Sequence, residues 1–76
     1  MVVGVVMVTV VPGEERAVYG GLGKIHGVKD IFHVFGECDF IVILDVDGLS
    51  VLNSSVDKIR EIRGVTATKT IIGAEL

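Results

Sequence analysis

Seventy-six residues are enough for one domain, half of them are hydrophobic, and the formal net charge is −3. A chain this short buries only about 60–65% of its unfolded surface, so the apolar content predicts that a partner chain covers part of the folded surface. The acidic balance, without any basic run, excludes an electrostatic nucleic-acid footprint. Residues 1–76 are therefore interpreted as a single domain that makes no direct contact with nucleic acid.

The only cysteine, Cys38, cannot form an intramolecular disulfide, which fits a reducing compartment such as the cytoplasm. The apolar stretch at residues 1–11 contains no basic residue and is too short to cross a bilayer. We therefore expect a cytoplasmic protein without a membrane partner.

The first two elements expected along the chain are a strand and a helix. β-Branched residues dominate Val2–Val11 and favour a strand, which Pro12 and Gly13 end. A helix is expected from Glu14 to about Lys24, because acidic residues suit the positive end of a helix. The apolar residues of this helix recur at helical spacing, at Val18, Leu22 and Ile25.

Two strands, a second helix and a last strand follow. The strands are expected at Val28–Phe35 and Phe40–Val46, with the turn Gly36–Asp39 between them. Asp47 is the expected N-cap of the second helix. The fourth strand is expected at Val65–Ile72, before a short tail to residue 76. The apolar stripe of the second helix consists of Leu49, Leu52, Val56, Ile59 and Ile62.

An internal repeat supports this division of the chain. Residues 24–36 and 61–73 each contain the pattern Ile-x-Gly-Val, then seven residues, then a second glycine. Each copy has the features of a helix end, a glycine stop and a strand. Gly27 and Gly64 therefore occupy positions where a glycine with positive φ is expected just past a helix.

The order β-α-β-β-α-β, with right-handed crossovers, predicts an α+β fold of the ferredoxin-like type. This plan is a four-stranded antiparallel sheet with two helices on one face. The first and third strands are apolar on both alternating sets and belong in the centre, whereas the second and fourth carry polar edge residues. Because the face without helices would then be apolar as well, we expect a dimer in which two sheets pack together.

The residues that could carry chemistry give no catalytic or metal site. Cys38 and His33 flank one hairpin and could approach each other, but Cys38 is more often a small buried hydrophobic residue. His26 precedes a helix end, where a cation suits the helix dipole. The CxxC motif of ferredoxin-like metal carriers is absent from the sequence. We therefore expect no enzyme activity, no metal and no cofactor.

The turn Gly36–Asp39 has two readings. It is either a plain hairpin turn or a ligand loop, whose amide N–H groups hold a carboxylate and whose Asp39 pairs with an ammonium group. Thr66, Thr68 and Thr70 are likewise either β-branched edge residues or hydrogen-bonding partners of a polar ligand. The turn and these threonines should lie at one end of the sheet but on opposite edges, roughly 14 Å apart. A site that uses both is therefore expected to combine two subunits.

A set of short motifs follows the Val-rich first strand, in this order: Pro12-Gly13, Ile25–Val28, Phe35–Asp39, Ile62–Val65 and Thr68–Thr70. Together they resemble the effector-binding and oligomerisation domain of Lrp/AsnC transcriptional regulators, also called the RAM domain. The resemblance spans nearly the whole chain.

This resemblance implies a dimeric α/β barrel with packed sheets, rings of dimers, and an amino acid bound at the junction between dimers. It implies ligand contacts by Phe35, Gly36 and Asp39, and by Thr68 and Thr70 of another subunit. Full regulators carry a helix-turn-helix domain before this one, so the chain resembles a stand-alone form. Such a form either senses an amino acid itself or co-assembles with a full-length regulator. Family turns often have an aromatic residue where this chain has Cys38.

Two other functions share this architecture. A small enzyme on the dimeric α/β barrel plan would need a polar cavity inside one protomer, whereas the helix stripes and central strands here are apolar. An ACT-type regulatory domain would also bind an amino acid but would pair edge to edge. The apolar open face of the sheet favours face-to-face pairing.

Overall fold

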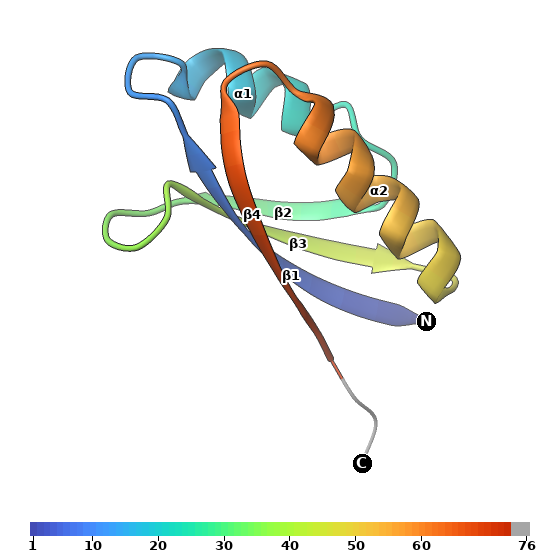
Figure 1. Ribbon diagram of the computed structural model, residues 1–76. Helices are drawn as coiled ribbons and strands as arrows, with labels where there is room; N and C mark the ends of the chain where they lie inside the picture. Colours follow the sequence, from blue (N-terminus) through green and yellow to red (C-terminus); the bar gives the residue numbers. More distant parts are fainter. Residues whose placement is uncertain (74–76) are drawn as a thin grey trace.

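The computed structural model describes residues 1–73, and the expected tail lies outside them from residue 74 on. The elements are the six that the sequence predicts, in the same order (Figure 1). Their bounds are β1 (Val2–Val10), α1 (Glu15–Leu22), β2 (Val28–His33), β3 (Phe40–Val46), α2 (Leu49–Glu61) and β4 (Val65–Ile72).

The four strands form one antiparallel sheet in the order β2-β3-β1-β4. The two strands that are apolar on both sides, β1 and β3, are therefore central, and both helices cover the same face (Figure 1). This arrangement confirms the ferredoxin-like prediction. β1 ends where β3 and β4 begin, since Val8 is opposite both Phe40 and Thr68. The turn between β2 and β3 thus lies at the same end of the sheet as the start of β4.

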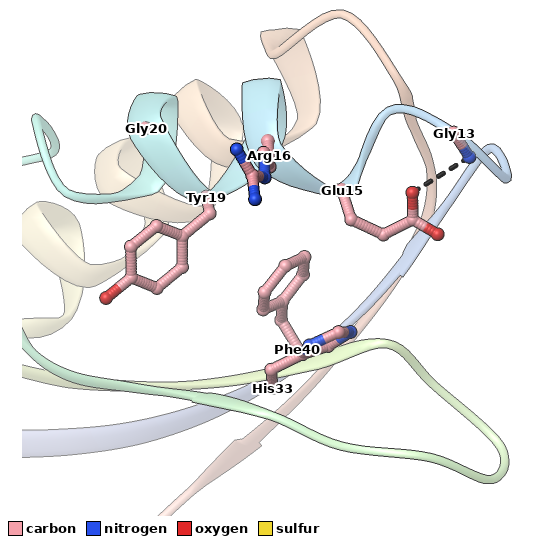
Figure 2. Close-up of a pocket in the computed structure, with 7 residues that line it drawn as sticks. All are labelled: Gly13, Glu15, Arg16, Tyr19, Gly20, His33 and Phe40. Carbon is pink, nitrogen blue, oxygen red and sulfur yellow. Dashed lines mark hydrogen bonds between the residues drawn. The ribbon is translucent and has the colours of Figure 1, made fainter.

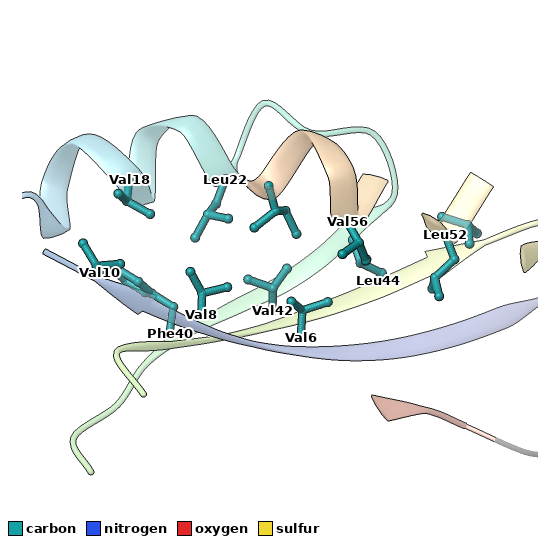
Figure 3. Close-up of a cluster of buried hydrophobic side chains, with 12 residues drawn as sticks. Val6, Val8, Val10, Val18, Leu22, Phe40, Val42, Leu44, Leu52 and Val56 are labelled. Atoms are coloured by element: carbon teal, nitrogen blue, oxygen red, sulfur yellow. The ribbon is translucent and has the colours of Figure 1, made fainter. Parts of the chain in front are cut away.

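The core lies between the sheet and the helices (Figure 3). Alternate residues of the central strands point into it, because side chains alternate across a strand. From the sheet come Val6, Val8, Val10, Phe40, Val42, Leu44 and Val46. From the helices come Val18, Leu22, Leu52, Val56 and Ile59. Five apolar helix residues thus cover one apolar face of the sheet, which fixes α1 and α2 above it.

Several element ends differ from the sequence prediction. β1 ends at Val10 rather than Val11, and α1 begins at Glu15 rather than Glu14. α1 ends at Leu22 rather than near Lys24, and Gly20, Gly21 and Gly23 account for this because each glycine weakens a helix by up to about 1 kcal/mol. β2 ends at His33, because the backbone after it turns to form the hairpin. The N-cap of α2 is Gly48 and not Asp47, and no side chain caps this helix end.

Gly27 and Gly64 have positive φ values of +91° and +104°, as the repeat predicts. Gly27 also lies where an added Cβ would collide with a methyl group of Val46. The backbone after α1 therefore approaches β3 so closely that no side chain fits between them. This contact fixes the start of β2 against the sheet.

The face of the sheet opposite the helices, here called the helix-free face, is also apolar. Its central residues are half-buried, and Phe32 and Ile71 at its margins are 52% and 53% exposed. The strand register assigns to this face the apolar residues Val3, Val5, Met7, Phe32, Ile41, Ile43 and Ile71, and it places Thr9, Asp30, Asp45 and Lys69 around them. No helix among residues 1–73 is long and apolar enough to cross a membrane.

Candidate functional site

The turn Gly36–Asp39 is tied to the end of β1. The Val34 amide donates to the Asp39 carbonyl at 2.9 Å and the Asp39 amide donates to the Val8 carbonyl at 2.9 Å. The Val10 amide donates to Asp39 Oδ2 at 2.7 Å. These bonds hold the hairpin across the end of the sheet. The Asp39 carboxylate therefore has a structural partner in its own chain, which the sequence did not reveal.

Phe35 and Gly36 are the exposed residues of the predicted site. The Phe35 side chain is 94% exposed, and its ring centroid lies 5.4 Å from that of His33. Gly36 has φ of +135°, and a Cβ at this position would meet nothing within 4 Å. The turn therefore presents an aromatic ring and an open stretch of backbone to solvent.

Thr68 and Thr70 lie on the helix-covered face of β4, because they pair with Val8 and Val6. The Arg60 Nε–H donates to Thr68 Oγ1 at 3.0 Å. Thr70 Oγ1 is buried and has no hydrogen-bond partner among the described residues. Among residues 1–73 no hydrogen bond joins either hydroxyl to Phe35 or Asp39, so the described part of one protomer does not bring the five predicted site residues together.

The middle of the turn nevertheless reaches β4. A small hollow of about 130 Å³, here called the turn hollow, brings Glu37 and Cys38 beside Thr68 and Lys69. The middle of the turn and Thr68 therefore line one hollow within a protomer. That a site using Asp39 together with the threonine hydroxyls combines two subunits stays a prediction, because the Thr68 hydroxyl is on the helix-covered face and bonds Arg60. The turn hollow is smaller than the roughly 300–1,000 Å³ of typical small-molecule sites.

A larger hollow lies on the opposite side of the sheet, between α1 and the β2–β3 hairpin (Figure 2). Its volume is about 850 Å³, and we call it the α1 hollow. It is lined by Gly13, Glu15, Arg16, Tyr19, Gly20, His33 and Phe40. Tyr19 extends down from α1, and Phe40 rises from the sheet opposite it (Figure 2).

Aromatic rings form the inner wall of the α1 hollow. The ring centroids of His33 and Phe40 lie 4.9 Å apart in a stacked arrangement, and those of Tyr19 and Phe40 lie 6.0 Å apart. Phe40 is 2% exposed, whereas Tyr19 is 54% exposed. The sequence analysis assigned none of these rings to a site. The available signal was the spacing of Glu15 and Tyr19, which are four residues apart and so share one helix face.

Cys38 and His33 do not form a reactive pair. His33 stacks on Phe40 and lines the α1 hollow, whereas buried Cys38 lines the turn hollow with Met7 and Thr9. Within residues 1–73 no group of three or more His, Cys, Asp and Glu side chains is arranged to hold a metal ion.

The fold is that of a small α+β domain with one apolar face left open and two hollows beside the β2–β3 hairpin. The chain belongs to the family of the Lrp/AsnC ligand-binding domain, whose model matches residues 3–74. This match confirms the family resemblance drawn from the sequence motifs. The family consists of ligand-binding domains of transcriptional regulators.

Individual relatives agree with this assignment. The chain is 33% identical over 51 residues to the HTH-type transcriptional regulator LysM of Saccharolobus solfataricus, a match that covers 67% of this chain and 36% of LysM. The chain therefore spans about a third of that regulator. The crystal structure of FFRP-DM1 superposes with a TM-score of 0.90 at 32% identity, covering 97% of this chain and all of the other.

A more distant structure has the same fold. It is the feast or famine regulatory protein Rv3291c of M. tuberculosis, complexed with L-methionine. Its TM-score is 0.83 at 21% identity, and the match covers this whole chain and 52% of the other.

Proposed function

We propose that this domain binds an amino acid effector and couples that binding to self-assembly in transcriptional regulation. The assembly is a homodimer through the helix-free faces and, beyond it, a ring of dimers. The same contacts allow co-assembly with full-length Lrp/AsnC regulators, and the domain works in the cytoplasm. We assign it no catalytic residue, because its family is regulatory.

The observation that carries this proposal is the family match over nearly the whole chain. The L-methionine complex of a protein with the same fold supports an amino acid as the effector class. The exposed apolar surface supports self-assembly, because a monomer seldom leaves a large apolar patch open to water.

The turn is the proposed contact for the polar end of the effector. A carboxylate has two oxygens, so Asp39 can hold the Val10 amide through Oδ2 and accept from a ligand ammonium through Oδ1. The open backbone at Gly36 and the Phe35 ring lie beside it. Thr68 and Thr70 of a neighbouring dimer complete the site in this proposal. An effector held at such a seam favours the oligomer that contains the seam, which is a population shift.

The test is thermal unfolding and native mass spectrometry of the whole chain with each of the twenty amino acids. An effector at about 100 times its Kd adds about 2.7 kcal/mol of stability, which raises Tm by about 10 °C or more for a domain of this size. We also expect the effector to increase the population of oligomers above the dimer.

Asp39→Asn separates binding from folding, because the amide oxygen still accepts from the Val10 N–H while the negative charge is lost. We expect this variant to unfold near the wild-type Tm and to lose the effector-induced rise. Asp57→Asn, at an exposed position on α2, is the matched control and should keep the rise. If no amino acid changes the Tm or the assembly of the wild-type chain, the proposed function is wrong.

A further inference from the structure

The α1 hollow has the size and the lining of a small-molecule site within one protomer. Its volume of about 850 Å³ falls in the range of roughly 300–1,000 Å³ typical of such sites, which are mostly apolar with a few polar groups. The rings of Tyr19, His33 and Phe40 supply the apolar wall. Glu15 and Arg16 supply opposite charges at the α1 side (Figure 2).

The aromatic residues of the chain are concentrated at this place. Tyr19 and Phe40 line the α1 hollow, and the Phe35 ring adjoins it through His33. Only Phe32 of the tyrosine and phenylalanine rings lies elsewhere, on the helix-free face. Core packing accounts for the place of Phe40, which is 2% exposed, but not for Tyr19 and Phe35, which are mostly exposed. Exposed aromatic rings around a hollow are suited to contact with an apolar ligand.

Two glycines keep the rim of the α1 hollow open. A Cβ at Gly13 or at Gly20 would meet no atom within 4 Å. Gly13 has a φ of +95°, which favours glycine by itself, so Gly20 is the position where a larger residue could project into free space. Glycine at position 20 weakens α1 by up to about 1 kcal/mol relative to alanine. No contact in the described chain requires this glycine, and a larger side chain at the rim would narrow access to the hollow.

The charges of Glu15 and Arg16 indicate which kind of ligand the α1 hollow suits. Glu15 Oε1 accepts from the Gly13 amide at 2.8 Å, which orients the carboxylate and leaves Oε2 for a ligand. The Arg16 guanidinium is a donor suited to a carboxylate. We propose that the α1 hollow is a second ligand site for an apolar amino acid. In this site Arg16 holds the carboxylate, Glu15 holds the ammonium group and the aromatic wall holds the side chain.

This site differs from the turn site of the proposed function, because it is complete within one protomer and needs no seam between dimers. Its occupation therefore does not depend on assembly. Tyr19 is the only tyrosine of a chain without tryptophan, so intrinsic fluorescence reports on the α1 hollow alone.

The experiment titrates the whole chain with L-leucine, L-methionine or L-phenylalanine and follows Tyr19 fluorescence. We expect a saturable response to at least one of them, at protein concentrations where the oligomeric state is constant. The best binder is then compared with the amine that lacks its carboxylate and the acid that lacks its ammonium group. For leucine these are 3-methylbutylamine and 4-methylpentanoate.

Charge-neutralising variants should separate the two ends of the ligand. Arg16→Gln should lower the affinity for the amino acid and for the acid about fivefold and leave the affinity for the amine unchanged. This is the effect expected for a charged hydrogen bond at an exposed site. Glu15→Gln should lower the affinity for the amino acid and for the amine and leave the affinity for the acid unchanged. The glutamine is chosen because its amide oxygen can still accept from the Gly13 N–H. Lys24→Gln, an exposed charge change beyond α1, is the matched control and should alter none of them.

Gly20→Leu tests the site without changing charge. Its side chain starts in open space at the rim, so we expect a folded protein that has lost the Tyr19 response to all three probes. A wild-type response that survives Gly20→Leu and Arg16→Gln places the ligand elsewhere and overturns the second site. A response to dilution without ligand overturns it too, because a neighbouring copy would then occupy the hollow. An effect of amino acids on assembly without any Tyr19 response overturns the second site and leaves the proposed function intact.

Discussion

At the scale of single residues, Asp39 stabilises the fold through its carboxylate, which accepts the Val10 amide at 2.7 Å at the end of β1. Asp39→Ala leaves this part-buried amide without its partner, and we expect a loss of about 1–3 kcal/mol in the free energy of unfolding. Urea denaturation measures the loss. Asp39→Asn should reduce the free energy of unfolding by less than half as much. The control Asp57→Ala, at an exposed position on α2, should have a free energy of unfolding within about 0.5 kcal/mol of wild type. Equal losses for the two Asp39 variants would contradict the hydrogen bond as the cause.

Substitution of glycine by alanine should have opposite effects on stability at positions 27 and 20. Gly27→Ala places a Cβ against Val46 at a φ of +91°, so we expect a loss of more than about 2 kcal/mol. Gly20→Ala puts a methyl group in open space within α1, and we expect a gain of about 0.5–1 kcal/mol. Equilibrium unfolding of both variants in urea checks the signs. A Gly27→Ala variant with the wild-type free energy of unfolding would show that the chain relaxes at this contact.

At the scale of elements, α2 packs on β1, and Leu52 lies especially close to Gly4. A Cβ at Gly4 would lie 2.6 Å from Leu52 Cδ1, so Gly4→Ala overpacks this point and should cost about 1–3 kcal/mol. Leu52 is fully buried, and Leu52→Ala should cost about 2–5 kcal/mol.

The double variant measures the coupling between the two elements. In the Leu52→Ala background we expect Gly4→Ala to be neutral or stabilising, because the new methyl group enters the cavity left by the leucine. A double-mutant cycle of unfolding free energies gives the interaction term. Simple additivity would mean that α2 does not lie against β1 as described. Leu49→Ala, exposed on the same helix, is the control and should change little.

The elements and their order were predictable from the sequence because apolar residues recur at strand spacing or at helix spacing within each element. β3 and β4 begin and end as predicted, and the apolar alternation of the central strands gives the sheet order. The ends of α1 and β2 were less predictable, because glycines and the hairpin decide them. The cap of α2 was missed, because the backbone at Gly48 and not the Asp47 side chain starts that helix.

The sites were less predictable than the fold, for a physical reason. A ligand hollow depends on which side chains the tertiary structure brings together, and Tyr19 and His33 belong to different elements, with no periodic relation in sequence. The Asp39–Val10 hydrogen bond joins residues 29 positions apart and was equally invisible. The turn was found only because Gly36–Asp39 has both turn chemistry and the family motif.

At the scale of the whole molecule, the helix-free face is the surface on which the proposed assembly rests. Val5 and Ile43 face each other at its centre, and Ile71 continues the apolar surface onto β4. A specific and stable interface generally buries more than about 1,000 Å² in total. The middle of the central strands supplies apolar surface for such an interface, whereas Asp30, Asp45 and Lys69 supply polar side chains around it.

Ile43→Lys tests this face at its centre. In a monomer the lysine would reach water from the open sheet, so the chain should still fold, with an unchanged circular dichroism spectrum. In a sheet-to-sheet dimer the charge would be taken out of water beside Asp30, its cross-strand neighbour, and desolvating even a paired charge costs several kcal/mol. We therefore expect wild type to sediment as a dimer or larger and Ile43→Lys as a monomer. Leu49→Lys, exposed on α2, should sediment like wild type. A monomeric wild type at high concentration, or an Ile43→Lys variant that still dimerises, would contradict face-to-face assembly.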